Sequence, residues 1–199
     1  MDLQITVCLL FILFAGGHSF SCHQCSNTSS SCNQASQCPT GISNCLSATA
    51  TANGTIVNIK SCAPAGCPNG SINFGTEQVS SLCCNTDLCN VQDAPDPRNN
   101  TLNEGKCYYC DGQSCSKRVN CAGSEDRCFS ATVPLSTTSG NQSQVLKGCV
   151  SKSICNVTNL IPGLDGFSCC EGFLCNNAKS VTQSFLFLCC SLLFFILLH

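Results

Sequence analysis

The chain has 199 residues, of which 23 are cysteine and none is tryptophan, and its formal net charge is −2. So many cysteines in a chain of this size are typical of a secreted scaffold that is held together by disulfides rather than by a large apolar core. The charge is small and no basic face is visible, which excludes the electrostatic signature of a nucleic-acid-binding protein.

Residues 1–19 are predicted to be a signal peptide. An apolar run between positions 5 and 15 has the length of a signal-peptide core, and the small residues after it suit cleavage before Phe20, with cleavage before His18 as the alternative. Either site sends the chain into the secretory pathway, where oxidising compartments allow disulfides to form.

Ten cysteines then occur twice, in the same order and at nearly the same spacing. The first set is Cys22, Cys25, Cys32, Cys38, Cys45, Cys62, Cys67, Cys83, Cys84 and Cys89, and the second is Cys107, Cys110, Cys115, Cys121, Cys128, Cys149, Cys155, Cys169, Cys170 and Cys175. Five of the nine gaps between successive cysteines are identical. We therefore predict two tandem disulfide-built modules, module one at residues 20–90 and module two at residues 106–176.

The long gaps between cysteines predict short antiparallel strands joined by turns. In module one, residues 46–52 and 55–61 flank Asn53-Gly54, which is a strong hairpin signal. In module two, alternating apolar residues at 129–133 and the segment 145–150 flank a turn-like stretch. No segment has convincing helical periodicity, so the predicted fold class is all-β and disulfide-rich.

Residues 91–105 are predicted to be a linker between the modules. They contain no cysteine, include two prolines and are mostly polar. Arg98 fits a solvated charge in such a linker, and a protease-cleavage site is the alternative.

The C-terminus ends in an apolar stretch, residues 185–198, that is shorter than the roughly 20 residues of a transmembrane helix. A polar spacer and small residues precede it, and no basic stop follows. This order predicts a GPI-attachment signal, with residues 178–199 as the propeptide and Asn177 as the lipid-bearing residue. Asn176 and Ala178 are the alternative attachment residues, and a short membrane helix is the alternative to an anchor.

The chain also carries six sequons, in which an asparagine is followed by any residue except proline and then by serine or threonine. The predicted glycosylation sites are Asn27, Asn53, Asn69, Asn99, Asn141 and Asn156. In an exported chain we expect most of them to carry glycans on exposed loops, with an unoccupied asparagine as the alternative at each.

Metal and catalytic chemistry are both disfavoured. Cys-x-x-Cys occurs at 22–25 and 107–110, but neither module has the second such pair that a zinc ribbon requires, so we predict disulfides and no metal or cofactor. The mature chain offers His23 as a catalytic base, with His18 added if cleavage is early. His23 lies inside a Cys-x-x-Cys turn with no recognisable nucleophile motif, so we predict that the protein is not an enzyme.

The pattern Cys-x2-Cys … Cys-Cys-x4-Cys-Asn resembles the lymphocyte-antigen and urokinase-receptor (LU) superfamily, and the resemblance covers both modules up to Asn90 and Asn176. It implies two tandem three-finger, snake-toxin-like domains, in which each closing asparagine ties the module end to neighbouring backbone. It also implies a pairing that the sequence alone leaves open. The implied disulfides are Cys22–Cys45, Cys25–Cys32, Cys38–Cys62, Cys67–Cys83, Cys84–Cys89, Cys107–Cys128, Cys110–Cys115, Cys121–Cys149, Cys155–Cys169 and Cys170–Cys175.

Within the superfamily, two modules with a GPI signal resemble the multi-module urokinase-receptor branch. The stretch 107–115 also resembles the gamma-type inhibitors of secreted phospholipases. Two function classes follow. The first is a GPI-anchored, glycosylated cell-surface binding or adhesion receptor, on the extracellular face of the plasma membrane, that presents disulfide-pinned fingers to an extracellular protein partner. The alternative is an inhibitor of a secreted enzyme of phospholipase or protease type.

The predicted partner-contacting residues lie in the last loop of module two, where apolar side chains are dense. They are Leu160, Ile161, Leu164 and Phe167. Ile72 and Phe74 of module one are weaker candidates. The alternative for all of them is that they cover the small core of their module.

Overall fold

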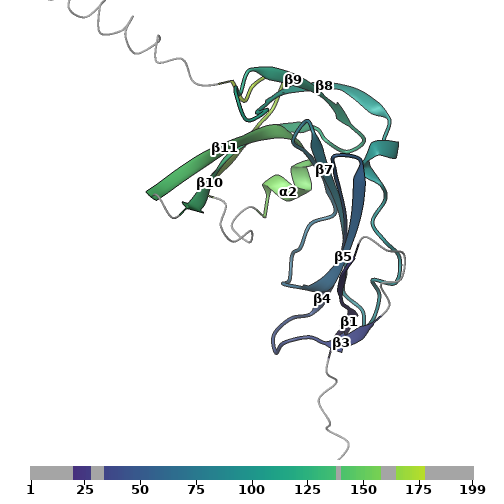
Figure 1. The fold of residues 1–199 in the computed structure, drawn as a ribbon. Coiled ribbons are helices and arrows are strands. Elements are labelled where there is room, and N and C mark those ends of the chain that lie inside the picture. The colour runs from purple at the N-terminus through teal and green to yellow at the C-terminus, as the bar shows by residue number, and fades with distance from the viewer. Residues whose placement is uncertain (1–19, 28–33, 138–139, 158–164, 178–199) are drawn as a thin grey trace, which may run out of the picture.

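The structure is a computed structural model that describes residues 20–27, 34–137, 140–157 and 165–177 (Figure 1). The predicted signal peptide and propeptide lie outside these residues. So do Cys32 and three of the predicted contact residues, namely Leu160, Ile161 and Leu164.

The chain folds mainly into β-strands, which confirms the predicted all-β class. The strands of module one are β1 (Ser21–His23), β2 (Cys25–Asn27), β3 (Ala35–Gln37), β4 (Asn44–Ala52), β5 (Thr55–Ala63), β6 (Gly70–Asn73) and β7 (Glu77–Cys84). The strands of module two are β8 (Leu102–Tyr109), β9 (Lys117–Ala122), β10 (Arg127–Thr137), β11 (Gly140–Val150) and β12 (Asp165–Cys170). The helical elements of the described residues are a 3-10 turn, η1 (Pro97–Asn99), and one turn of α-helix, α2 (Lys152–Cys155).

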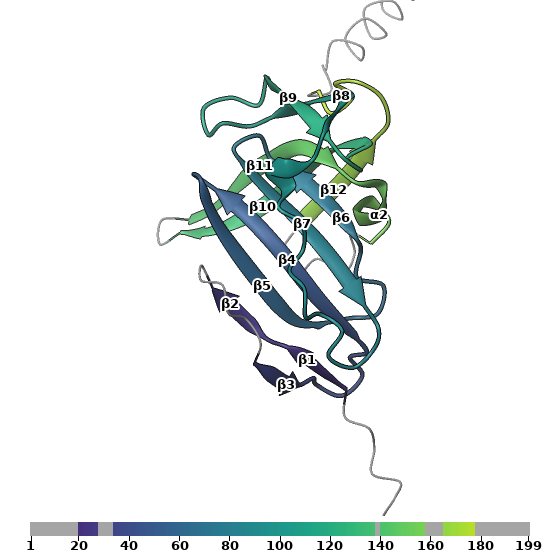
Figure 2. The same cartoon turned by 90° about the vertical axis from the view of Figure 1, so that its right-hand side faces the viewer.

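Strands of both modules belong to one antiparallel sheet of eight strands, in the order β12-β10-β11-β6-β7-β4-β5-β2 (Figure 2). The modules meet where β11 pairs with β6, at Val150 opposite Ile72 and Cys149 opposite Asn73. Strands β1 and β3 form one small separate sheet, and β8 and β9 form another. The two modules are therefore joined by backbone pairing as well as by the intervening chain.

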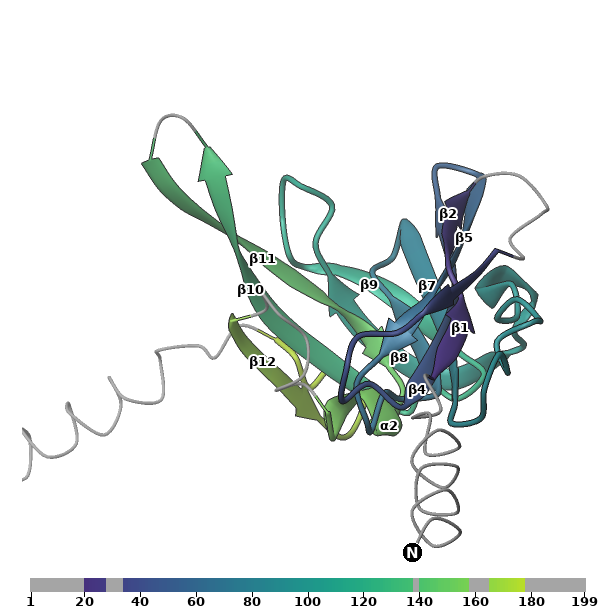
Figure 3. The same ribbon diagram turned by 90° about the horizontal axis from the view of Figure 1, so that it is seen from below.

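Two long hairpins dominate the sheet. The β4–β5 hairpin turns at Asn53 and Gly54, whose φ angles of 50° and 80° are the left-handed values that this dipeptide adopts readily, so the predicted hairpin is confirmed. The β10–β11 hairpin pairs Arg127 with Val150 at its base and projects away from module one (Figure 3).

Stacked disulfides form the centre of each module in place of a large apolar core. In module one, Cys22 and Cys45 are fully buried, and the Cys22 sulfur lies 3.3 Å from that of Cys38 in the neighbouring bridge. In module two, the sulfurs of Cys107 and Cys121 lie 3.5 Å apart in the same arrangement. Closing loops of this length stabilises a small module by roughly 3 kcal/mol per bridge in the chain-entropy model, although the bridges do not add linearly.

Nine disulfides join described cysteines, and each is a pair that the family resemblance implies. They are Cys22–Cys45, Cys38–Cys62, Cys67–Cys83, Cys84–Cys89, Cys107–Cys128, Cys110–Cys115, Cys121–Cys149, Cys155–Cys169 and Cys170–Cys175. The tenth implied pair, Cys25–Cys32, lies outside the described residues because it includes Cys32.

Residues 91–95, at the start of the predicted linker, are fixed to module one. Hydroxyl groups at alternate positions of β4 reach its backbone: Ser47 Oγ donates to the Gln92 carbonyl at 2.8 Å, and Thr49 Oγ1 donates to the Ala94 carbonyl at 2.6 Å. Ala94 is only 4% exposed as a result. We call residues 91–95 the strap. The polar composition that indicated a solvated linker reflects hydrogen bonding to a polar sheet face.

Candidate functional site

The junction between the modules is held by an apolar cluster centred on Phe129 of β10. Phe129 is 1% exposed, and its ring lies between two others. The ring of Phe74 from module one meets it edge-on, with centroids 5.5 Å apart, and the ring of Phe167 from β12 stacks on it at 5.2 Å. Aromatic pairs of this kind add roughly 0.5–1.5 kcal/mol beyond the area they bury.

A buried carboxylate holds the polar half of the junction. Glu125 is 2% exposed; its Oε1 accepts from Ser71 Oγ of module one at 3.0 Å, and its Oε2 accepts from the Ala122 backbone at 2.9 Å. Burial raises the pKa of the Glu125 carboxyl, and these hydrogen bonds offset part of that effect. Ser71 also exchanges hydrogen bonds with Ser151, at 2.9 and 3.0 Å. Because a buried charge without partners is costly, this pairing couples the two modules.

Two glycines allow the modules to approach closely. A Cβ on Gly148 of β11 would lie 1.9 Å from the backbone oxygen of Asn73 in β6. A Cβ on Gly75 would lie 2.2 Å from the ring of Tyr109, and the φ of Gly75 is +93°. Backbone and ring therefore occupy the space that a side chain would need at these positions, and the junction depends on glycine.

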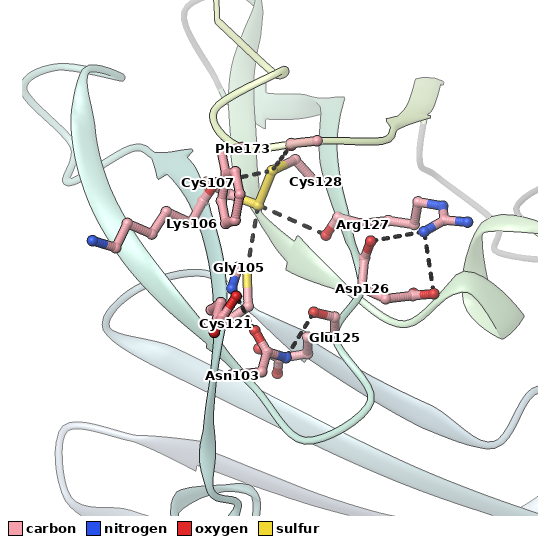
Figure 4. Close-up of a pocket in the computed structure, with 12 residues that line it drawn as sticks. Asn103, Gly105, Lys106, Cys107, Cys121, Glu125, Asp126, Arg127, Cys128 and Phe173 are labelled. Atoms are coloured by element: carbon pink, nitrogen blue, oxygen red, sulfur yellow. Dashed lines mark hydrogen bonds and ion pairs between the residues drawn. A yellow bond between two sulfur atoms is a disulfide. The ribbon is translucent and has the colours of Figure 1, made fainter.

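A cavity of about 350 Å³ lies in module two, and Glu125 of the junction forms part of its lining (Figure 4). Its wall includes the Cys107–Cys128 disulfide, with the Phe173 ring beside it, and it is bounded by parts of β8, the turn before β10 and the Cys170–Cys175 loop. Phe173 is 65% exposed, the largest exposed fraction of any large apolar side chain in the described residues. We call this surface the cavity face. A volume of this size lies within the range of ligand pockets.

Charged side chains surround the cavity face. Arg127 pairs with Asp126 at 3.2 Å and with Glu171 at 2.6 Å, so its guanidinium is held in place beside the cavity. Glu104 and Lys106 also border the cavity, and both are exposed. The combination of a fixed arginine with an exposed aromatic ring is typical of residues that contribute strongly to protein–protein binding.

The predicted contact residues are placed differently. Phe167, Ile72 and Phe74 all pack in the cluster around Phe129 and are only partly exposed. The sequence left open whether these side chains contact a partner or cover apolar interior. Their position favours the interpretation that they cover apolar interior. The interior they cover belongs to the junction between the modules, which was not predicted from the sequence.

Neither Phe173 nor Glu125 was predicted as a site residue from the sequence. Phe173 had a usable signal, because the short loop closed by Cys170–Cys175 has no room to bury an aromatic ring. Glu125 had none, since it stands in the polar run Ser124-Glu125-Asp126-Arg127, which has the composition of an exposed turn.

Four of the predicted glycosylation sites are exposed in the structure: Asn53, Asn69, Asn99 and Asn156. The other two, Asn27 and Asn141, lie on β2 and β11. Arg98, in the linker, pairs with Asp96 at 2.6 Å and lies in η1 rather than in extended chain.

The clustered sulfurs do not constitute a metal site. Those of Cys107, Cys121 and Cys149 lie within 4.8 Å of one another, which is close enough for a shared ion. Each belongs to a disulfide, however, and only a thiolate serves as a ligand.

The closing asparagines make the same three hydrogen bonds in both modules. Asn90 exchanges two with the backbone of His23, both at 2.9 Å, and donates a third to Leu46 at 3.0 Å. Asn176 does the same with Tyr108, at 2.9 Å for both, and with Phe129 at 2.8 Å. The disulfide framework, the hairpins and these asparagines together define a protein of two tandem three-finger modules.

Comparison with known families agrees with this class. The model described as snake toxin and toxin-like protein matches residues 20–90 and again residues 106–176. The chain belongs to this family. In the described residues, no helix has both the length and the apolar character needed to cross a membrane.

Individual relatives are more distant. The urokinase plasminogen activator surface receptor of Aotus trivirgatus is 31% identical over 137 residues, which cover 59% of this chain and 38% of that protein. Protein psiQ of Dictyostelium discoideum is 26% identical over 195 residues, covering 83% of this chain and 20% of that protein. U-scoloptoxin(05)-Cw1a of Cormocephalus westwoodi is 30% identical over 97 residues, covering 45% and 82%. The chain thus spans well under half the length of the first two.

Among solved structures, the crystal structure of mouse TEX101 is similar at 20% sequence identity and covers 70% of this chain and 84% of that chain. The TM-score is 0.26, which is too low for the likeness to support any argument about function.

Proposed function

We propose that this protein is a GPI-anchored, glycosylated cell-surface binding protein that presents the cavity face to an extracellular protein partner, and that it is not an enzyme. The observation that carries the proposal is the exposed Phe173 ring beside a cavity whose wall includes a disulfide. A surface fixed by covalent bridges loses little conformational entropy when it binds, so most of its contact energy appears as affinity.

The anchor rests on the order of small residues, polar spacer and apolar tail at the C-terminus, and on membership of a family that includes a protein named as a surface receptor. Phe173 stands only four positions before Asn177, the proposed attachment residue. A partner on the cavity face therefore lies close to the membrane, and we expect it to be a protein of the same cell surface.

The anchor is tested by treating intact cells with phosphatidylinositol-specific phospholipase C. Release of the protein into the medium supports the anchor, and a surface fraction that resists release contradicts it.

The cavity face is tested by affinity capture from cells that display Phe173→Asp. We expect loss of the co-captured surface protein with unchanged surface expression. Val91→Asp is the matched control, since Val91 is 56% exposed on module one and should retain the partner. Equal loss in both variants would contradict the assignment of the cavity face.

The alternative function, inhibition of a secreted enzyme, gives a different result. The released ectodomain would then inhibit a secreted phospholipase or urokinase in solution, and Phe173→Asp would leave the co-captured surface protein unchanged. We expect both enzymes to keep their full activity.

A further inference from the structure

Module one contains a buried lysine whose charge is neutralised by neighbouring groups. Lys60 of β5 is 3% exposed. Its ammonium donates to the Val91 carbonyl and pairs with the Asp93 carboxylate at 3.0 Å. Both acceptors belong to the strap, which follows the closing Asn90. A lysine buried to this extent needs such partners, because an unpaired ammonium in the interior is strongly disfavoured.

Module two has a lysine at the equivalent position. Lys147 stands two residues before Cys149, as Lys60 stands two residues before Cys62. In the strand pairing, Lys147 is opposite Ser130 of β10, and Lys60 is opposite Ser47 of β4. Lys147 is 7% exposed, so it is buried much as Lys60 is.

The two lysines differ in their partners. Among the residues that the structure describes, the Lys147 ammonium has no hydrogen-bond or ion-pair partner, whereas the Lys60 ammonium has both. Across the described part of the chain, the one fully enclosed side-chain nitrogen or oxygen without a partner is Nδ1 of His23. The Lys147 ammonium therefore still reaches solvent, and a group from outside the described residues can approach it.

The chain leaves both modules in the same way. Asn90 and Asn176 make matching hydrogen bonds to the backbone of their modules, as described above. Asn177, which follows Asn176, consequently stands where Val91 stands in module one. We expect its carbonyl to face Lys147 as the Val91 carbonyl faces Lys60.

The next positions do not match in charge. Asp93, two residues after Val91, corresponds to Lys179, two residues after Asn177. Lys179 carries the same charge as Lys147 and so cannot neutralise it. The polypeptide after module two thus lacks the anion that the strap provides in module one.

We propose that Lys147 binds the phosphate of a GPI anchor attached to Asn177; this rests on the anchor of the proposed function. In such an anchor, ethanolamine links the carbonyl of the attachment residue to a phosphate. The number of bonds from the Asn177 carbonyl to this phosphate is similar to the number from the Val91 carbonyl to the Asp93 carboxylate. Removal of residues 178–199 also removes Lys179. Phosphate is an acceptor that lysine binds as a point charge. The last segment of the anchored protein is then held on the β10–β11 sheet rather than hanging free.

The test uses the anchored protein as cells make it, released from membranes by phosphatidylinositol-specific phospholipase C. Phosphorus NMR of the released protein observes the phosphate that links ethanolamine to the anchor glycan. At low salt we expect its resonance to be displaced from that of a free ethanolamine phosphodiester, and to return to the free position in Lys147→Met. Lys106→Met is the control, because Lys106 is exposed and its ammonium pairs with no acidic group of the described residues.

The outcomes separate this proposal from the anchor itself. A protein that the phospholipase does not release overturns both. A released protein whose phosphate resonance is the same in the unmodified chain, Lys147→Met and Lys106→Met overturns the Lys147 site alone and leaves the anchor intact. Surface expression of Lys147→Met, measured before release, shows whether that variant folds. If it does not fold, Lys147→Arg is used, because arginine keeps the positive charge. Lys147→Arg must then show the displaced phosphate resonance, and a resonance at the free position overturns the site.

Discussion

The substitution Gly148→Ala should separate the two modules without unfolding either. The new Cβ would lie 1.9 Å from the Asn73 backbone oxygen and 2.9 Å from its carbonyl carbon. Ordinary contacts between such atoms are longer than 3 Å, so β11 and β6 must move apart by more than 1 Å. The obstacle is backbone in a paired strand, which no rotamer change relieves.

Two estimates of the cost agree. Forcing one extra carbon into a packed site costs roughly 1–3 kcal/mol, and a backbone obstacle places the value near the upper end. Opening the junction instead gives up the short β6–β11 pairing, at roughly 1 kcal/mol per hydrogen bond, and the Phe74–Phe129 contact at roughly 1 kcal/mol. Either route predicts a loss of about 3 kcal/mol of inter-module coupling.

The assay is amide hydrogen exchange together with small-angle X-ray scattering. The amides of Ser71 and Ser151 donate hydrogen bonds across the junction, and they should lose protection by about two orders of magnitude, since each 1.4 kcal/mol is a factor of ten. Amides of the β4–β5 hairpin should be unaffected, and the radius of gyration should increase. Ser143→Thr adds a methyl group to an exposed position of β11 and serves as the matched control. Unchanged protection at Ser71 and Ser151 in Gly148→Ala would show that the new Cβ does not separate β11 from β6.

Three further predictions concern neighbouring features. Phe129→Ala removes the ring between Phe74 and Phe167 and should lower the free energy of unfolding by about 3 kcal/mol, measured by denaturant titration with the disulfides intact. Burial raises the pKa of Glu125 in the folded protein, so its contribution to stability is fully present below the unfolded pKa and is lost as pH rises through the folded pKa. The fall in stability above about pH 4 should therefore be shallower in Glu125→Gln than in the unmodified protein. Parallel profiles of stability against pH would contradict this. Asp93→Asn removes the anionic partner of Lys60 and should increase exchange at the amides of the strap while junction amides stay protected; equal exchange in both proteins would show that the hydroxyl contacts alone hold the strap.

The local part of the fold was predictable from the sequence. Repeated cysteine spacing locates both modules, and Asn53-Gly54 locates the hairpin because the left-handed backbone it requires is a property of those two residues. These features depend on short-range geometry or on covalent bonds, so they need no knowledge of which surfaces meet.

The junction was not predictable in the same way. Strand β6 has only four residues, Gly70–Asn73, and its pairing with β11 depends on contacts between residues about 80 positions apart. Phe167 and Phe74 were recognised as unusual loop residues. Without knowledge of the junction, the sequence could not decide whether these side chains are buried or contact a partner. The strap was missed because a polar segment that binds a polar sheet face has the same composition as one that binds water.

The joined sheet narrows where a partner can bind. Burial of Phe74 and Phe167 at the junction removes two of the apolar side chains that the sequence offered as contacts. Each long hairpin carries a sequon near its tip, at Asn53 in module one and at Asn141 in module two, so glycans there would keep a protein partner away from both tips. No sequon asparagine lines the cavity face, where Phe173 remains exposed. Within the described residues, the cavity face therefore combines an exposed apolar side chain, a disulfide-fixed backbone and the absence of predicted glycans. For this reason Phe173 should be tested before any residue of the hairpin tips.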